Sequence, residues 1–375
     1  MSIPIKSALI IGGGFSGMSA AIALSRIGVE VTLIEIDPNW RTDGAGITVS
    51  GPSMRAIEAL GLLPVFLQNG CLHEALDVFD AKGDLLKQIP MPKVPGSDIV
   101  GGGGTMRPAF AKAMGEVVRS MDISVKLGVT YTSISDGEDQ ARVTFSDGSD
   151  DNFDLVIGAD GVFSSVRRDY FPGAQEPKYT GQGVWRAVIP RFGVKNSMQY
   201  LGKNSKFGFT PVSEDEMYLY YTQARPTKER IPDDQLLPQL NALLAEYTSP
   251  IMRDISATLT DSSQILYRPL EGMLMPRPWY RGRLLLIGDC VHATTPHLAS
   301  GAGMGHEDAV VLADELSKGG ELISVLERFQ NRRWERCRMI VANSHRLGEI
   351  EIEGGSPQEH TQIMALTISA LLAPV

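Results

Sequence analysis

Three glycines and one acid near the start of the chain have the spacing needed to bind a dinucleotide. The glycines follow the pattern G-x-G-x-x-G, which permits a tight turn from strand to helix, close approach of a pyrophosphate, and close packing of the helix. The phosphates would lie at the helix N-terminus, and the acid would accept hydrogen bonds from a ribose diol. The predicted dinucleotide-binding residues are Gly12, Gly14, Phe15, Ser16, Gly17 and Glu35.

A strand, a helix and a second strand must position these residues. Residues 7–11 form an apolar run that leads into the glycines, an apolar helical pattern follows, and residues 29–35 form a second apolar strand that ends in the acid. The alternative is a glycine-rich turn in some other α/β protein, because a glycine triplet alone is weak evidence. The strand, helix, strand and terminal acid together favour the dinucleotide interpretation.

Two more acids end apolar strands later in the chain. Asp160 follows residues 155–159, and Asp289 follows residues 284–288. Ligands bind at the carboxyl edge of open α/β sheets, so Asp289 could accept a hydrogen bond from a sugar hydroxyl. A helix N-cap is the alternative for Asp289, and a plain turn is the alternative for Asp160. Residues 301–305 then open a helix whose free backbone N–H groups would face any ligand in front of them.

The motifs at 7–35, 154–168 and 283–309, in this order, resemble those of the class A flavoprotein monooxygenases, the family of para-hydroxybenzoate and salicylate hydroxylases. The resemblance covers essentially the whole chain. It implies FAD as the cofactor, NADH or NADPH as the reductant, and O₂ as co-substrate. It also implies hydroxylation of a small planar aromatic or heteroaromatic substrate through a flavin C4a-hydroperoxide.

The resemblance also assigns FAD contacts. The acid at 289 matches the family's ribityl contact, the acid at 160 lies near the pyrophosphate, and the helix start faces the flavin N1–C2=O edge. Two arginines match FAD-contacting arginines, with a solvated helix-start residue as the alternative for each. Residues 299–301 read Ala-Ser-Gly where the family commonly has Gly-Gln-Gly. The additional FAD contacts are Arg41, Arg107, Asp160, Gly288, Asp289, Pro296, Gly301, Ala302, Gly303 and Met304.

We expect an α/β fold in which a Rossmann-like FAD-binding domain carries an inserted β-rich substrate domain, the para-hydroxybenzoate hydroxylase-like fold. The FAD-binding domain is predicted at residues 1–72, 101–172 and 264–375, and the substrate domain at 73–100 and 173–263. Turn residues predict two hairpins. The hairpin strands are predicted at 74–79 with 85–89 and at 141–145 with 153–157; further strands are predicted at 183–190, 205–212, 217–222 and 283–287, and helices at 234–247 and 307–316.

The substrate pocket should lie between the inserted sheet and the flavin. Aromatic residues on the predicted strands are candidates for its walls, and these are Trp185, Phe207, Phe209, Tyr218 and Tyr220. Alternation along a strand directs Tyr218 and Tyr220 to the same side. There is no clear Arg or Lys clamp for a carboxylate. His73 and His297 are candidate proton acceptors, with a hydrogen-bonded structural histidine as the alternative for each.

Composition and charge argue against nucleic-acid-binding, disulfide-rich and membrane proteins. A net charge of −9 argues against a nucleic-acid surface, and the arginine-rich run 328–338 is interpreted as the solvated face of an amphipathic helix. Three isolated cysteines offer neither a disulfide framework nor a metal site, which fits the cytoplasm. We find no secretory leader, and residues 363–375, too short to span a bilayer, are interpreted as a core helix. No membrane partner is expected, and the protein is expected to be a monomer or homodimer.

Four alternatives remain. An FAD-dependent halogenase would need a second tryptophan where Ala187 stands in the segment 185–190. A nicotinamide dehydrogenase would have no use for the Gly288-Asp289 motif. Another flavin oxidoreductase of the same fold would share the FAD motifs, whereas a non-enzymatic escort resembling GDP-dissociation inhibitors would lack flavin.

Overall fold

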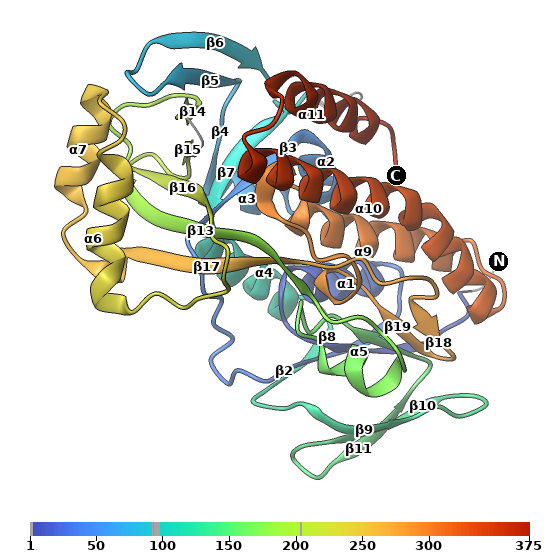
Figure 1. Ribbon diagram of the computed structural model, residues 1–375. Helices are drawn as coiled ribbons and strands as arrows, with labels where there is room; N and C mark the ends of the chain where they lie inside the picture. Colours follow the sequence, from blue (N-terminus) through green and yellow to red (C-terminus); the bar gives the residue numbers. More distant parts are fainter. Residues whose placement is uncertain (1–2, 92, 94–97, 203–204) are drawn as a thin grey trace.

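The computed structural model describes residues 3–91, 93, 98–202 and 205–375, and Figure 1 shows its arrangement. A six-stranded sheet with the order β18-β19-β12-β1-β2-β8 lies under the helices of one half of the molecule. Its neighbouring strands are parallel except for β18, which is antiparallel to β19. The strands are β1 Ser7–Ile11, β2 Glu30–Glu35, β8 Ile123–Leu127, β12 Leu155–Gly158, β18 Tyr280–Arg281 and β19 Leu284–Leu286.

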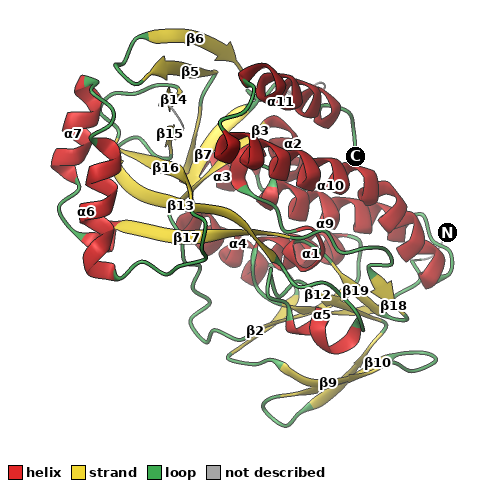
Figure 2. Ribbon diagram, in the orientation of Figure 1, coloured by secondary structure: helices red, strands yellow, loops and turns green. Residues whose placement is uncertain are grey.

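Helices cover one side of this sheet and a small antiparallel sheet, β11-β10-β9, lies on the other (Figure 2). The apolar run in β1 and β12 is fully buried because both faces of the parallel sheet are covered. The covering helices include α1 Phe15–Arg26, α4 Arg107–Ser120 and α9 Gly301–Ser317, and α8 Asp289–His292 is a single turn after β19. Helix α5 Ser165–Tyr170 lies beside the small sheet, where Asp169 accepts a hydrogen bond from the Tyr131 hydroxyl at 2.7 Å. The small sheet contains β9 Tyr131–Ser135, β10 Ala141–Phe145 and β11 Asp150–Phe153.

A seven-stranded sheet with the order β17-β13-β16-β15-β14-β5-β6 forms the other half. One side of it packs against α6 Asp233–Leu244 and α7 Pro250–Thr258, and we call this the outer face. The side that carries Arg186, Lys206, Tyr218 and Tyr220 is the inner face. The strands are β5 Ala75–Asp80, β6 Leu85–Pro90, β13 Lys178–Pro190, β14 Ser197–Leu201, β15 Lys206–Pro211, β16 Glu216–Ala224 and β17 Ile265–Gly272.

A fourth sheet, the antiparallel β3-β7-β4, joins the two halves. Glycines permit this contact: a Cβ at Gly46 would lie 2.4 Å from the Cβ of Tyr218, and one at Gly104 would lie 2.4 Å from Cγ2 of Thr210. These glycine strands therefore dock directly on the inner face. The elements here are β3 Gly46–Ser50, α2 Gly51–Ala59, α3 Leu63–Asn69, β4 Gly70–Leu72 and β7 Gly102–Met106.

The chain ends in two helices, α10 Leu322–Glu353 and α11 Pro357–Leu371, and short 3₁₀ turns lie at Ser262–Gln264 (η1) and Pro296–Leu298 (η2). The expectation of a core helix near the C-terminus is wrong, because α11 lies on the surface with Leu366 62% exposed and only Thr367 and Leu371 buried. Among the described residues, no helix is long and apolar enough to cross a membrane.

Most predicted elements are present, with two corrections. The first hairpin forms as β5 and β6, but β10 pairs with β11 at 150–153 rather than with 153–157. The segment 155–158 instead enters the parallel sheet as β12, beside β1. Because β17 pairs with β13 as far as Gly272, we propose that the substrate-side unit ends there rather than at residue 263.

Candidate cofactor and substrate site

The first turn after β1 has the backbone geometry that the glycine pattern predicts. Gly12 has φ +109°, and a Cβ there would lie 2.5 Å from the carbonyl oxygen of Ala159. A Cβ at Gly17 would lie 1.9 Å from the carbonyl oxygen of Gly12, so the helix packs on the turn as expected. Gly14 has no described atom within 4 Å of its Cβ position, and it is exposed. The turn therefore leaves open space at the position where a pyrophosphate would approach.

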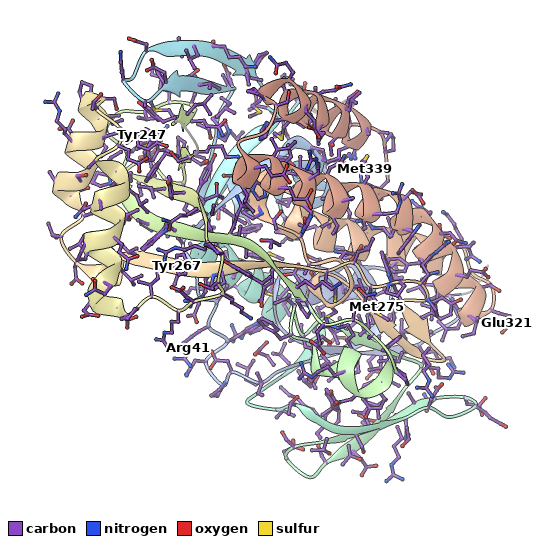
Figure 3. The ribbon with its side chains drawn as sticks, in the orientation of Figure 1. Arg41, Tyr247, Tyr267, Met275, Glu321 and Met339 are labelled. Carbon is purple, nitrogen blue, oxygen red and sulfur yellow. The ribbon has the colours of Figure 1, made fainter. Side chains whose placement is uncertain are left out.

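The acid at the end of β2 is held by the backbone. Glu35 Oε2 accepts a hydrogen bond from the N–H of Gly13 at 2.7 Å, and Oε1 accepts one from Asp37 at 2.9 Å. Each carboxylate oxygen keeps acceptor capacity for a ribose hydroxyl. Arg41 lies on an outlying loop in Figure 3 and is paired with Asp37 at 2.9 Å. The structure thus places Arg41 at the surface, with its charge directed to an acid on its own loop.

The acids at the ends of β12 and β19 differ sharply. Asp160 accepts hydrogen bonds from the N–H groups of Ser165 and Val166 at 2.7 and 3.2 Å, and from the Ser164 and Ser165 hydroxyls. It therefore closes the start of α5. Asp289 is exposed at the start of α8 and makes no hydrogen bond to the residues that the structure describes. The carboxylate of Asp289 is the one available to a sugar hydroxyl.

Arg107 connects this corner to the inner face. Its guanidinium lies 5.4 Å above the ring of Phe15. Desolvation and the nearby charge of Arg186 lower the pKa of Arg107, while Asp289 and Tyr218 oppose the shift. Arg107 is nevertheless exposed to solvent. Arg107 therefore lies between the exposed carboxylate of Asp289 and the inner face, where Asp289, Arg186 and Tyr218 all influence its pKa. We call this region the Arg107 corner.

The glycine-rich start of α9 is packed closely by two neighbouring helices. A Cβ at Gly305 would lie 2.1 Å from the hydroxyl oxygen of Ser16 on α1, and one at Gly303 would lie 1.9 Å from that of Ser53 on α2. Gly288 is also in contact with Ser16. The N–H groups of residues 301–303 have no protein acceptor within the described segments. These free donors suit the electron-rich edge of a flavin.

Buried charged residues hydrogen-bond to the backbone and side chains around Gly288. Asp308 Oδ2 accepts hydrogen bonds from the N–H of Gly288 at 2.8 Å and from Nε2 of His292 at 2.7 Å, while Oδ1 accepts one from Nε of Arg333 at 2.7 Å. Burial opposes ionisation of Asp308, but His292 and Arg333 lower its pKa to about 2. His292, Asp308 and Cys337 could hold a metal by position. Because Arg333 already neutralises Asp308, we assign no metal there.

The interpretation of residues 328–338 as a solvated face is wrong. Arg333 is fully buried, and Arg336 is 10% exposed at its side chain. Both donate to Glu307, Arg333 from Nη1 at 2.8 Å and Arg336 from Nη2 at 2.6 Å. The acidic partner of Arg333 and Arg336 lies on α9, so these two arginines face the protein interior, whereas Arg338 is exposed and pairs with Glu335 of its own helix.

The five predicted wall residues divide between the two faces of the seven-stranded sheet. Trp185, Phe207 and Phe209 are fully buried on the outer face, in one cluster with residues of α6 and α7. Figure 3 shows Tyr247 and Tyr267 on this same side. A surface hollow of about 550 Å³ between α6 and β17 also lies on this side, away from Arg107 and Asp289. Tyr218 and Tyr220 alone among the five lie on the inner face.

The inner face also carries charges that the aromatic pattern did not reveal. Arg186 donates from Nε to the Tyr218 hydroxyl at 2.8 Å, and the rings of Tyr218 and Tyr220 are 5.8 Å apart. Lys206 stands beside Thr222 in the pairing of β15 with β16 and forms an ion pair with Glu351 of α10. Strand alternation gives Arg186 the opposite side from Trp185, which was the available signal.

The two histidines are both buried. His73 is 2% exposed, its Nε2 lies 3.0 Å from the Ser197 hydroxyl, and desolvation lowers its pKa to about 4. The His297 side chain is 1% exposed, its Nδ1 lies 2.9 Å from the Thr295 hydroxyl, and burial lowers its pKa. A general base must reach the proton it takes. We therefore do not propose either histidine as the base that contacts substrate.

The arrangement fits a flavin dinucleotide. The open position at Gly14, the carboxylates of Glu35 and Asp289 and the free N–H groups of α9 supply acceptors and donors along one edge of the six-stranded sheet. The inner face closes the far side with two tyrosines and Arg186. Such a set can hold a cofactor at its phosphate, sugar and ring ends and present a planar ring beside it.

Comparison with known proteins agrees with this geometry. A family model described as an FAD binding domain matches residues 6–344. The 2-heptyl-3-hydroxy-4(1H)-quinolone synthase of Pseudomonas aeruginosa is 31% identical, with 91% of this chain and 88% of the relative covered. The 6-hydroxynicotinate 3-monooxygenase of Pseudomonas fluorescens is 29% identical, with 90% and 89% covered. HpxO of Klebsiella pneumoniae, solved with FAD and uric acid, has a TM-score of 0.83 at 23% identity, covering 98% of this chain and 92% of that chain.

Proposed function

The chain belongs to the class A FAD-dependent aromatic monooxygenases, and on that premise we propose that it hydroxylates an uncharged planar heteroaromatic ring of the quinolone type, with O₂ as the oxygen source. The enzyme is an FAD-dependent monooxygenase, and NAD(P)H is the reductant typical of its family. Bound FAD would take up the two electrons of NAD(P)H and supply the oxygen-activating chemistry. The specific ring, O₂ use and a cytoplasmic location are parts of the proposal.

The observation that carries the choice of ring is the pairing of Arg186 with Tyr218. The compounds in the names of the two relatives differ in charge, since 6-hydroxynicotinate bears a carboxylate and the quinolone does not. A carboxylate is best bound by an arginine free to make two parallel hydrogen bonds. Arg186 instead donates from Nε to the Tyr218 hydroxyl. Because this bond occupies Nε, Arg186 cannot use its Nε–Nη2 side for a bidentate ion pair, which supports a ring held mainly by aromatic contact and single hydrogen bonds.

The residues around the Arg107 corner would have separate tasks. Asp289 would accept from the ribityl hydroxyls, and the first N–H groups of α9 would stabilise negative charge on the reduced flavin ring. Tyr218 and Tyr220 would hold the substrate ring flat beside it. The same aromatic surfaces would exclude water, which otherwise diverts the reaction to hydrogen peroxide.

A screen of substrate-stimulated NAD(P)H oxidation tests the proposal. We expect 4(1H)-quinolones and uncharged hydroxypyridines to stimulate oxidation, and the hydroxylated product to gain one heavy oxygen atom from labelled O₂ and none from labelled water. Benzoate and pyridine carboxylates serve as matched charged rings. Stimulation by the carboxylates alone, or a product without labelled oxygen, would contradict the proposal.

A further inference from the structure

Glu351 lies in the last turn of α10, where an acid is electrostatically unfavourable. The C-terminal end of a helix carries partial negative charge, which disfavours a carboxylate by about 0.3–1 kcal/mol. The family model ends at residue 344, before this position. Glu351 must therefore be held by groups outside its own helix, and those groups come from both halves of the molecule.

Five polar side chains surround the Glu351 carboxylate. Lys206 of β15 forms an ion pair with Oε1, and the Thr222 hydroxyl of β16 donates to Oε2 at 3.0 Å. Gln182 of β13 donates from Nε2 at 3.3 Å. The remaining two are His297 of η2 and His360 of α11, with Nε2 atoms 3.3 and 3.7 Å from the carboxylate.

The helix carrying Glu351 packs closely against Gln182 and His297. Gly348 lies one turn earlier on α10, and a Cβ there would be 2.7 Å from Oε1 of Gln182 and 3.0 Å from Cε1 of His297. Lys206 and Glu351 are 13% and 16% exposed at their side chains, so the pair is nearly but not wholly removed from water. Lys206, with smaller contributions from His297 and His360, holds the pKa of Glu351 well below its usual range despite burial.

The Lys206–Glu351 ion pair lies on the inner face next to Tyr220, which is followed by Tyr218. Tyr220 follows Lys206 and Thr222 along the inner face, and its ring lies against Gly208, whose Cβ position is 2.0 Å from Cζ of Tyr220. Desolvation, Tyr218 and then Glu351 raise the pKa of Tyr220, so Glu351 acts electrostatically on this ring. A substrate ring beside Tyr218 and Tyr220 would therefore experience the charges of Lys206 and Glu351.

We propose that Glu351 is a specificity-determining residue that neutralises Lys206 beside the substrate ring and so disfavours substrates bearing a carboxylate. This inference rests on the proposed function, because it concerns the same inner face. Without Glu351, Lys206 would present an uncompensated ammonium, which attracts an anionic ring. Without Lys206, Glu351 would present an uncompensated carboxylate, which repels one.

The test uses one ring system with and without the charge. Dissociation constants of 4(1H)-quinolone and of its 2-carboxylate would be measured on the FAD-loaded enzyme by the change in flavin absorbance, together with the melting temperature. In Glu351→Gln the ratio of affinities should move about five- to tenfold toward the carboxylate, the size of one partly buried charge interaction. In Lys206→Met it should move in the opposite direction.

Glu349→Gln is the matched control, because Glu349 lies on the same helix but pairs at the surface with Arg346 and His345. Its ratio should equal that of the wild type. A wild type that binds the carboxylate more tightly than the neutral ring would contradict the proposed function. A wild type that prefers the neutral ring, with Glu351→Gln or Lys206→Met leaving the ratio unchanged, would overturn the role of Glu351 alone.

Discussion

The two faces of the seven-stranded sheet are built from the same strands but serve different ends. On the outer face, Phe207, Phe209 and Trp185 are fully buried against α6 and α7. On the inner face, Arg186 and Tyr220 remain partly exposed and polar groups are paired across strands. The outer face contributes core packing, and the inner face carries polar groups that remain available for binding. Changes on the outer face should therefore affect folding, whereas changes on the inner face should affect binding.

The largest expected effect is on the outer face. Phe209→Ala removes a ring that stacks with Phe207 at 5.9 Å between centroids and contacts the ring of Tyr200. Burial and the resulting cavity predict a loss of about 3–5 kcal/mol in the free energy of unfolding. Urea denaturation measures this loss. A loss below about 1 kcal/mol would show that the outer face is not the principal core of this half.

Acid should lower the free energy of unfolding through the buried side chain of His73. Its pKa is about 4 in the folded chain, below the ordinary 6.5, so the unfolded chain binds more protons between these values. Stability should therefore fall as the pH drops from 6.5 to 4, by about 1.4 kcal/mol per pH unit for each such histidine. His306, buried beside Ser19, has the same pKa and contributes equally.

The fall in the free energy of unfolding across this pH range should be shallower in His73→Gln than in the wild type, because one buried histidine with a lowered pKa is removed while His306 and His297 remain. His360→Gln is the control, since His360 lies partly exposed on α11. An unchanged slope in His73→Gln would mean that His73 is protonated in the folded state.

A moderate effect is expected from Arg186→Met on the inner face. The variant removes the donor to the Tyr218 hydroxyl and a charge near Arg107, while the aliphatic part of the side chain is retained. The KM for a quinolone should rise about tenfold, and the free energy of unfolding should change little. A variant with a clearly lower free energy of unfolding but an unchanged KM would reverse the assignment of the two faces.

The smallest effect should come from Tyr218→Phe. This change keeps the ring against Gly46 and Tyr220 and removes only the hydroxyl that accepts from Arg186. A net loss of about 1 kcal/mol corresponds to about a fivefold weaker affinity for the ring. Titration of the FAD-loaded enzyme measures it. An effect larger than that of Arg186→Met would show that the hydroxyl itself contacts substrate.

The sequence was sufficient where a motif dictates backbone geometry. Gly12 and Gly17 occupy positions where a Cβ would collide, and any chain with that spacing must fold in this way to use it. It was insufficient where the role depends on partners elsewhere. Asp160 and Asp289 both end apolar strands, but only the position of α5 decides that the first carboxylate is consumed by hydrogen bonds.

The same limit applies to faces and charges. Alternation predicts that Trp185 and Arg186 point to opposite sides, but it does not say which side meets α6 and α7. The burial of Arg333 depends on Glu307 and Asp308, which lie on another helix. The seventh strand, β17, joins its sheet through pairing with β13, and only the three-dimensional register reveals this.

Ser16 has a consequence for how far this part of the molecule can be altered. A Cβ at Gly288 or at Gly305 would lie 2.2 or 2.1 Å from its hydroxyl oxygen, so the start of α1, the corner at Asp289 and the start of α9 are in direct contact through one small side chain. A larger residue at any of these three positions would push the elements apart and displace together the groups expected to bind the phosphate, ribityl and ring ends of FAD.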